Sequence, residues 1–273
     1  MIIDGHAHAC GDYLTPAKIN QTLLESGADR VVLVPGELNS DKTYPFPNVA
    51  KYFPNSNVTK FFNHLTKFVV KVTKPKEDFK KGNDFVYSLV KALPEKVIQF
   101  YLVTDDHNNI SNVLTAKHNE QGFKGLKIHH CWFPILIDSE LFTQTVDWAT
   151  EHEIPLFVHL LSDKEVNKLI EYKKSHPKLK LIVAHLFGLE LFIKSDFKDE
   201  NLYFDISTYQ VTSDKRVLKA IDFLGSDKIV MGSDTPYGKG NLKNNIDRIK
   251  NLDISTEEKD LILGENMKRL LKL

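Results

Sequence analysis

The chain has 273 residues, of which 42% are hydrophobic and 26% charged; this is ordinary for a globular protein and excludes a disordered one. Lysine plus arginine and aspartate plus glutamate both number 36, so the formal net charge is zero. A neutral chain shows no electrostatic footprint for nucleic acid or for an anionic membrane. We therefore expect a small-molecule substrate and neither of those partners.

The N-terminal residues show no basic start followed by a long apolar run, and no later segment is long and apolar enough to span a bilayer. The two cysteines, Cys10 and Cys131, are too few for a disulfide framework. We expect a cytoplasmic protein in which both remain thiols.

Eight short runs rich in Val, Ile, Leu and Phe alternate with segments of helical spacing, which is typical of repeated β and α units. Such alternation predicts a parallel sheet, and eight strands is the number of a TIM barrel. We therefore predict one α/β domain over 1–273 with the (β/α)8 fold. The predicted strands are 1–8, 30–35, 97–103, 125–129, 155–160, 179–186, 202–206 and 228–232.

Helices are predicted between these strands and after the last one. Thr15 can cap the first of them, and Pro16 suits its first turn. The last is expected to pack on the outside of the barrel. The predicted helices are 16–26, 139–151, 164–174, 215–224 and 256–271.

An insertion is predicted after the second strand, at approximately 37–81, because this stretch is too long for an ordinary βα loop. It contains several aromatic residues between Tyr44 and Phe53 and a basic run over 71–81. Insertions at this end of a barrel strand lie over the active site, so a lid or a pocket wall is one interpretation. A packed surface excursion or a dimer contact is the other, and a homodimer is possible.

Histidines and a carboxylate recur where predicted strands end. His6 and His8 are two residues apart on the first strand, so both side chains and that of Asp4 share one face. His159, His185 and Asp234 end three later strands, and the carboxyl ends of barrel strands form the catalytic rim. Lys127 and His129 share a face at the end of the fourth strand and belong to the same rim.

This residue set predicts a catalytic metal ion. His6, His8 and His159 supply the three protein ligands of a catalytic zinc site, and Asp234 binds the ion weakly or accepts a proton from its water. His185 is expected to act as a general acid or as a donor to developing oxyanion charge. One such histidine alone is more often structural, but five residues on one rim favour a site. The other histidines are expected at the surface, with His107 and His130 the weakest cases: His64, His107, His118, His130, His152 and His176.

With these residues in place, the chain resembles the amidohydrolase superfamily, in particular the amidohydrolase-related group (amidohydrolase family 2) that includes aminocarboxymuconate semialdehyde decarboxylase. The resemblance rests on short motifs in the family's order along nearly the whole chain. They are Ile3-Asp4-Gly5-His6-Ala7-His8, Phe123-Lys124-Gly125-Leu126-Lys127, Pro155-Leu156-Phe157-Val158-His159, Val183-Ala184-His185, Tyr203-Phe204-Asp205-Ile206-Ser207, Met231-Gly232-Ser233-Asp234-Thr235-Pro236 and Gly264-Glu265-Asn266.

The resemblance implies a mononuclear site with His6, His8, His159 and Asp234 as ligands and His185 as the acid–base residue. One zinc ion per chain is expected, although manganese, iron or cobalt suit the same ligands. Some superfamily members carbamylate a fourth-strand lysine to bridge two metals. Lys127 therefore has three possible functions: a carbamate, a cationic substrate contact or a paired structural lysine. His129 is a further candidate for contacting the substrate or a second metal.

The resemblance also implies two reactions, hydrolysis and non-oxidative decarboxylation. We predict a metal-dependent hydrolase of an amide, ester or lactone, because decarboxylases of this group place an arginine against the substrate carboxylate and this chain has no arginine on an evident rim loop. A decarboxylase is the alternative, and a non-catalytic ligand-binding barrel is a third. Candidate pocket walls are Trp132, Tyr209, Tyr237 and the aromatics between Tyr44 and Phe53.

Overall fold

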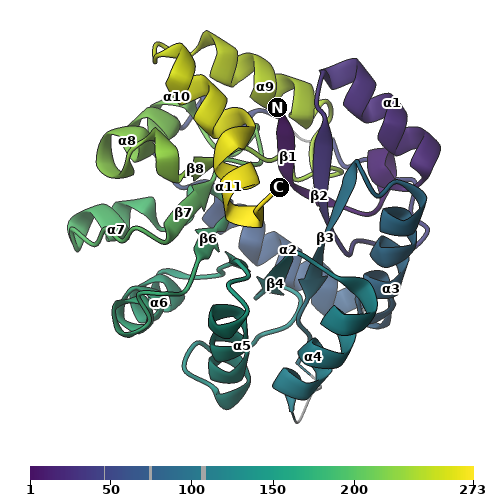
Figure 1. Ribbon diagram of the computed structural model, residues 1–273. Helices are drawn as coiled ribbons and strands as arrows, with labels where there is room; N and C mark the ends of the chain where they lie inside the picture. The colour runs from purple at the N-terminus through teal and green to yellow at the C-terminus, as the bar shows by residue number, and fades with distance from the viewer. Residues whose placement is uncertain (46, 74–75, 106–108) are drawn as a thin grey trace.

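The computed structural model describes residues 1–45, 47–73, 76–105 and 109–273, so Phe46 and His107 lie outside the described residues. Eight parallel strands follow one another in chain order around a barrel, as the sequence predicts (Figure 1). They are β1 (Ile3–His8), β2 (Arg30–Val34), β3 (Val97–Leu102), β4 (Gly125–His129), β5 (Leu156–His159), β6 (Leu181–Val183), β7 (Leu202–Asp205) and β8 (Ile229–Val230).

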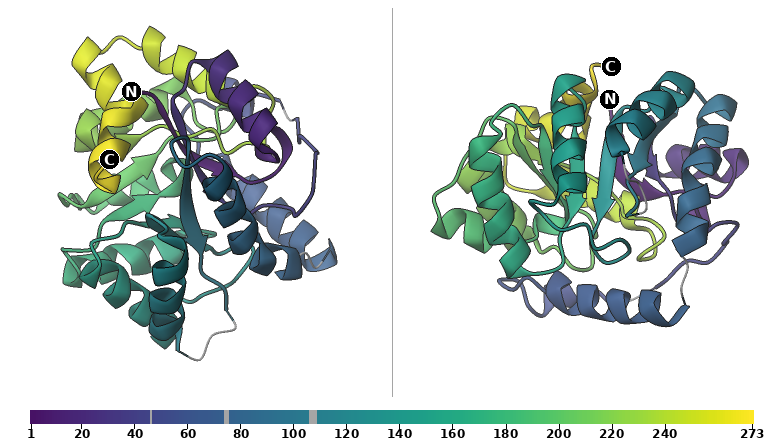
Figure 2. Two further views of the ribbon diagram at one scale, coloured as in Figure 1. Left: turned by 45° about the vertical axis from the view of Figure 1, so that its right-hand side comes forward. Right: turned by 90° about the horizontal axis from the view of Figure 1, so that it is seen from below.

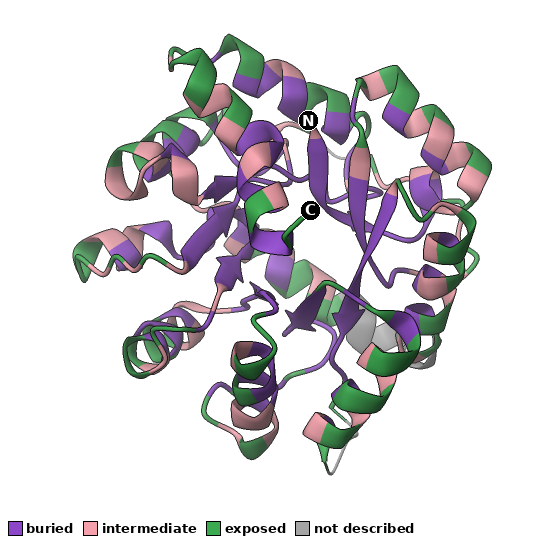
Figure 3. Ribbon diagram, in the orientation of Figure 1, coloured by how far each residue is buried: buried purple, intermediate pink, exposed green. Residues whose placement is uncertain are grey.

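Helices surround this barrel and bury their inner faces on it (Figures 1 and 3). Thr15 caps α1 as predicted, since its side chain accepts a hydrogen bond from the Lys18 backbone amide. The helices of the described chain are α1 (Pro16–Ser26), α2 (Thr59–Thr73), α3 (Lys76–Ala92), α4 (Ile110–Gln121), α5 (Glu140–Glu151), α6 (Asp163–Ser175), α7 (Leu189–Lys194), α8 (Asp214–Leu224), α9 (Asn241–Asn251), α10 (Thr256–Asp260) and α11 (Asn266–Leu271).

The segment between β2 and β3 differs from the predicted insertion at 37–81. Its last part belongs to α3, which is the ordinary barrel helix of this βαβ unit and packs on β3. The additional element is α2, which crosses the end of the barrel opposite the two termini (Figure 2, right). The basic run hid the start of α3, because its lysines reduce the apolar periodicity that marks a helix.

The C-terminal segment closes the other end of the barrel, and the expectation that it packs on the outside is wrong. Helix α11 lies over this end of the barrel (Figure 1), and its Met267, Leu270 and Leu271 are buried in one cluster with strand residues such as Ile3. Gly264 allows this approach, because a Cβ at that position would overlap the backbone oxygen of Met1.

Two expectations from composition can be compared with the structure. Cys10 and Cys131 are both buried, and neither forms a disulfide with a described residue. Among the described helices, none combines the length and the apolar character that crossing a bilayer requires.

The barrel closes where β1 meets the end of β8. The backbone amide of Gly5 donates to Met231 O over 2.9 Å, and that of Asp234 donates to His6 O over 2.7 Å. Asp4 reinforces this closure, because its carboxylate accepts the backbone amide and the hydroxyl of Ser233, each at 2.7 Å, and the hydroxyl of Tyr13 at 2.8 Å. The register of β1 shifts between Asp4 and Ala7. Asp4 was predicted to share a face with His6 and His8, and in the structure its hydrogen bonds support the barrel closure.

We expect Asp4→Ala to lower the free energy of unfolding by about 2–5 kcal/mol, because it leaves the buried Ser233 and Tyr13 donors without an acceptor. Tyr13→Phe removes one of these bonds and should cost only about 1 kcal/mol. Denaturant unfolding in the presence of a chelator measures both. Equal losses in the two variants would show that Asp4 does not hold the closure.

Candidate active site

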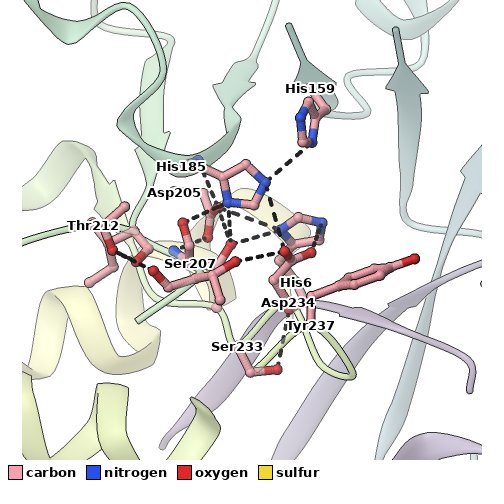
Figure 4. Close-up of polar contacts among 12 residues, drawn as sticks. His6, His159, His185, Asp205, Ser207, Thr212, Ser233, Asp234 and Tyr237 are labelled. Carbon is pink, nitrogen blue, oxygen red and sulfur yellow. Dashed lines mark hydrogen bonds and ion pairs between the residues drawn. The ribbon is translucent and has the colours of Figure 1, made fainter. Parts of the chain in front are cut away.

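The predicted site residues meet at the carboxyl ends of β1, β5, β6 and β8 (Figure 4). His6 and His8 come from β1, His159 ends β5, His185 lies just after β6, and Asp234 lies just after β8. All five are buried, with at most 8% of any of them exposed. Burying so many polar groups is costly unless they bind one another or a ligand.

The Asp234 carboxylate is the centre of this group. Its Oδ1 lies 3.2 Å from His8 Nε2 and 3.5 Å from His6 Nε2, and its Oδ2 lies 4.0 Å from His185 Nε2. Oδ2 also accepts the hydroxyl of Thr208 over 2.7 Å. Burial alone would raise the pKa of Asp234, but the three histidines outweigh it and lower that pKa below its ordinary value. The carboxylate is therefore ionised at neutral pH.

The backbone after β6 and β8 is bent to present these side chains. His185 has φ 57° and Asp234 has φ 58°, both in the left-handed region that non-glycine residues rarely adopt. The closure bond from Asp234 N to His6 O, and a bond of 3.1 Å from His185 N to Asp205, hold them there. Such strained conformations persist where the surroundings fix them, and they cluster at functional sites.

The two histidines of β1 direct their Nε2 atoms toward Asp234. His8 Nδ1 lies 2.8 Å from Pro35 O, and a carbonyl can only accept, so Nδ1 carries the proton. His6 Nδ1 lies 2.9 Å from Ser207 Oγ, whose own proton is donated to Asp205. His6 Nδ1 is therefore also the donor, which leaves the lone pair on His6 Nε2. His8 Nε2 is within hydrogen-bond distance of the ionised Asp234 carboxylate, which can only accept, so in this structure His8 Nε2 donates to it.

His185 and His159 face each other in a way that requires a cation. His185 Nδ1 lies 2.6 Å from the carbonyl oxygen of Ser207, which leaves the lone pair on Nε2. His159 Nε2 lies 2.8 Å from Asn63 Oδ1, which leaves the lone pair on Nδ1. These two nitrogens are 3.2 Å apart, so their lone pairs repel unless a proton or a metal ion lies between or beside them.

The donor set fits a divalent cation. His6, His8 and Asp234 each offer one ligand atom, and these atoms lie within 4.8 Å of one another. Neutral imidazoles whose other nitrogen is hydrogen bonded, together with one carboxylate, are the ligands that zinc takes in catalytic sites. His159 is outside this closest group and reaches it through His185, so the ligand function of His159 stays a prediction.

A second close group, His6, His185 and Asp205, is explained without a metal. Here the histidine atoms are the Nδ1 nitrogens, which lie 3.5 Å and 3.8 Å from Asp205 Oδ2. Both nitrogens already have a nearer acceptor in Ser207, at its hydroxyl or its carbonyl. Asp205 and Ser207 thus orient the two imidazoles from behind.

Lys127 and His129 both reach the site, as predicted. Lys127 Nζ lies 2.9 Å from His6 Nε2 and 4.0 Å from the centre of the Phe157 ring. Burial lowers the pKa of Lys127 to about 7, and a cation binding His6 would have to displace this hydrogen bond. His129 stacks between Trp132 and His159, with ring centres 4.0 Å and 4.1 Å apart. The three functions considered for Lys127 stay predictions.

A cavity of about 90 Å³ opens onto these residues and has room for a few waters or a small molecule. Trp132 and Tyr237 line it as predicted, whereas Tyr209 lies under Arg248, and Tyr52 and Phe53 are exposed. A larger cavity of about 580 Å³ lies between α1 and α9 and contains none of the site histidines. The lining residues of the smaller cavity are His8, Thr59, Phe62, Asn63, Thr66, His129, Trp132, His159, His185, Thr208, Val211, Asp234 and Tyr237.

The other histidines divide into surface and buried ones. His64, His118, His152 and His176 are exposed or half-buried, as predicted. His130 is buried instead, and its Nδ1 lies 3.1 Å from the Glu165 carboxylate, which also caps the start of α6. It supports the loop after β4 and lies outside the cavity lining.

Several site residues carried no sequence prediction. Ser207 and Thr208 follow β7, as His185 follows β6, so the position after a buried strand was a usable signal. Asn63 gave no such signal, because it lies on α2, which in the sequence is far from the end of any strand. Hydroxyl and amide groups are also common in loops, so their type alone does not mark a site.

Comparisons with known proteins agree with this arrangement. Residues 63–273 match the protein family described as Amidohydrolase; His6 and His8 precede that range. No curated protein matches the sequence.

Solved structures match over nearly the whole chain at 13–14% identity, which shows a shared fold. One is 4-oxalomesaconate hydratase from Rhodopseudomonas palustris, with 14% identity, a TM-score of 0.65, and coverage of 100% of this chain and 96% of that chain. Another is 5-carboxyvanillate decarboxylase from Novosphingobium aromaticivorans with bound manganese, with 13% identity, a TM-score of 0.68, and coverage of 100% and 97%. A third is a probable 2-pyrone-4,6-dicarboxylic acid hydrolase from Acinetobacter baumannii, with 13% identity, a TM-score of 0.67, and coverage of 100% and 99%.

We expect Ser207→Ala to weaken zinc binding by about 10- to 100-fold, because it removes the acceptor that keeps the proton on His6 Nδ1. Competition with a chromophoric chelator measures this affinity. Ser88→Ala, at an exposed serine of α3, is the control and should bind like the unaltered chain. Unchanged affinity in Ser207→Ala would mean that His6 does not bind the ion through Nε2.

Proposed function

Because the chain belongs to the amidohydrolase family, we propose that it is a metal-dependent hydrolase that cleaves the amide, ester or lactone bond of a small molecule. The observation that carries this proposal is the ionised Asp234 carboxylate, which faces the Nε2 atoms of His6 and His8 at the wall of a cavity. Family membership and the neighbouring structures support an enzyme.

His6, His8 and Asp234 would hold the ion, with His159 as a further ligand. One zinc ion is the expected occupant, and manganese, iron or cobalt suit the same donors. A divalent cation at this position would acidify a water molecule and polarise a substrate carbonyl. The protein's part is to fix the ligands, keep the cavity beside them open and move protons.

Asp234 is placed to receive the proton of the attacking water. Its Oδ2 is held by Thr208, and its Oδ1 faces the β1 histidines, so the carboxylate cannot turn away from the cavity. His185 lies 4.0 Å from Asp234 and lines the same cavity. It can return that proton to the leaving group or donate to the developing oxyanion.

The cavity wall favours hydrolysis over decarboxylation. None of the residues described as lining it is an arginine or a lysine, which would pair with a substrate carboxylate. Two of the four arginines, Arg216 and Arg248, are buried against backbone carbonyls and cannot reach a substrate. A neutral carbonyl compound therefore suits the cavity better than an acid.

Decarboxylation is the second candidate, because decarboxylases are among the structures that share this fold. It would use the same ion and the same carboxylate. A non-catalytic barrel is disfavoured by the cavity next to the donor atoms, since a structural metal site has no need of an open position.

We expect the zinc-loaded chain to hydrolyse one member of a panel of small lactones, esters and amides, with proton release as the readout. Asp234→Asn should lower kcat by about 100- to 10,000-fold at saturating zinc, because it removes the proton acceptor. Asp253→Asn, at an exposed carboxylate, should have no effect. Release of carbon dioxide from a parallel panel of aryl and enoic acids, with no hydrolysis, would overturn the proposal in favour of a decarboxylase.

A further inference from the structure

Helix α2 brings an amide group onto a predicted metal ligand. The helix lies across the end of the barrel opposite the two termini (Figure 2, right). Four of its residues, Thr59, Phe62, Asn63 and Thr66, line the cavity. Asn63 is 2% exposed, and its Oδ1 lies 2.8 Å from His159 Nε2.

A second hydrogen bond fixes which way this amide points. Asn63 Nδ2 donates to the backbone oxygen of Leu160 over 2.7 Å, the residue directly after His159. A carbonyl oxygen can only accept, so the nitrogen of the amide must lie on that side. Oδ1 therefore faces His159, and it too can only accept.

The orientation of Asn63 in turn selects one tautomer of His159. The ring must donate from Nε2, which leaves the lone pair on Nδ1, and Nδ1 is the nitrogen that faces His185 in the site. A neutral imidazole has a single proton to place, and the Asn63 acceptor holds it on Nε2. No other described residue forms a hydrogen bond with Nε2 of His159, so Asn63 alone among them holds that proton there.

Helix α2 contacts the barrel through the face that carries Asn63 and the other cavity-lining residues. Phe61, Leu65 and Phe68 on its outer face are 50–70% exposed. Besides the Asn63 bonds, Lys60 pairs with Asp163 across partly exposed ends, and the Cys131 thiol donates to the backbone oxygen of Asn63 over 3.8 Å. Asn63 thus forms a buried polar contact between α2 and the proposed metal ligands.

We propose that Asn63 is a positioning residue that holds His159 in its Nε2-protonated tautomer, so that docking of α2 completes the metal site. Helix α2 then both forms a wall of the cavity and orients the ligand His159. When α2 is undocked, His159 is free to place its proton on Nδ1. The statement about metal binding rests on the proposed function, whereas the statement about the tautomer does not.

Nitrogen-15 NMR of the histidine rings in the full-length, metal-free chain tests the tautomer, with His159 assigned from the signal lost in His159→Gln. We expect Nε2-protonated His159 in the unaltered chain and a shift toward the Nδ1-protonated form in Asn63→Leu. Asn63→Asp keeps an acceptor and should keep the Nε2 proton. Thr66→Val, at another α2 residue that lines the cavity, should leave the ring signals unchanged.

Zinc affinity provides the second readout. We expect Asn63→Leu to bind zinc about 10- to 100-fold more weakly and Asn63→Asp to recover part of that loss. An Nδ1-protonated His159 in the unaltered chain, or an unchanged tautomer in Asn63→Leu, would overturn the inference; the first result needs no variant to fold. If the unaltered chain binds no zinc, the proposed function fails, and the ring signals still decide the function of Asn63.

Discussion

The contact between β1 and the end of β8 is the constraint on which the site depends. The amide of Asp234 donates to the carbonyl of His6, so one backbone bond both closes the barrel and places the carboxylate beside the first-strand imidazoles. Asp4 secures the same junction through Ser233. The same hydrogen bond therefore closes the barrel and positions the proposed metal ligands. A change that separates β1 from the end of β8 also separates the groups that would hold the cation.

Around this junction, a hydrogen bond to the outer nitrogen of each imidazole directs its inner nitrogen into the site. Pro35 and Ser207 occupy the outer nitrogens of His8, His6 and His185, and Asn63 occupies that of His159. Several buried lone pairs and one carboxylate then face a common space, which is unfavourable without positive charge. In this structure Lys127, when protonated, supplies part of that charge at His6. A bound metal ion would supply it for the whole group.

The barrel and the catalytic rim were predictable because both follow from periodicity along the chain. Buried strands produce apolar runs, and a polar residue at the end of such a run, such as His159 or Asp234, faces the rim whatever the rest of the fold does. Asn63 could not be found this way, since its position depends on how α2 crosses the barrel. The closing segment was misplaced for a similar reason: an apolar face shows that α11 is buried but not what covers it.

The most direct test of this account is the metal content of the chain purified without added metal or a chelating tag, measured by elemental analysis beside a His6→Ala, His8→Ala double variant. The account requires one divalent ion per chain in the unaltered protein and none in the variant. Two ions per chain would contradict the mononuclear site and indicate a bridging function for Lys127. No bound ion, even after zinc or manganese is supplied, would contradict the account itself and leave only the barrel.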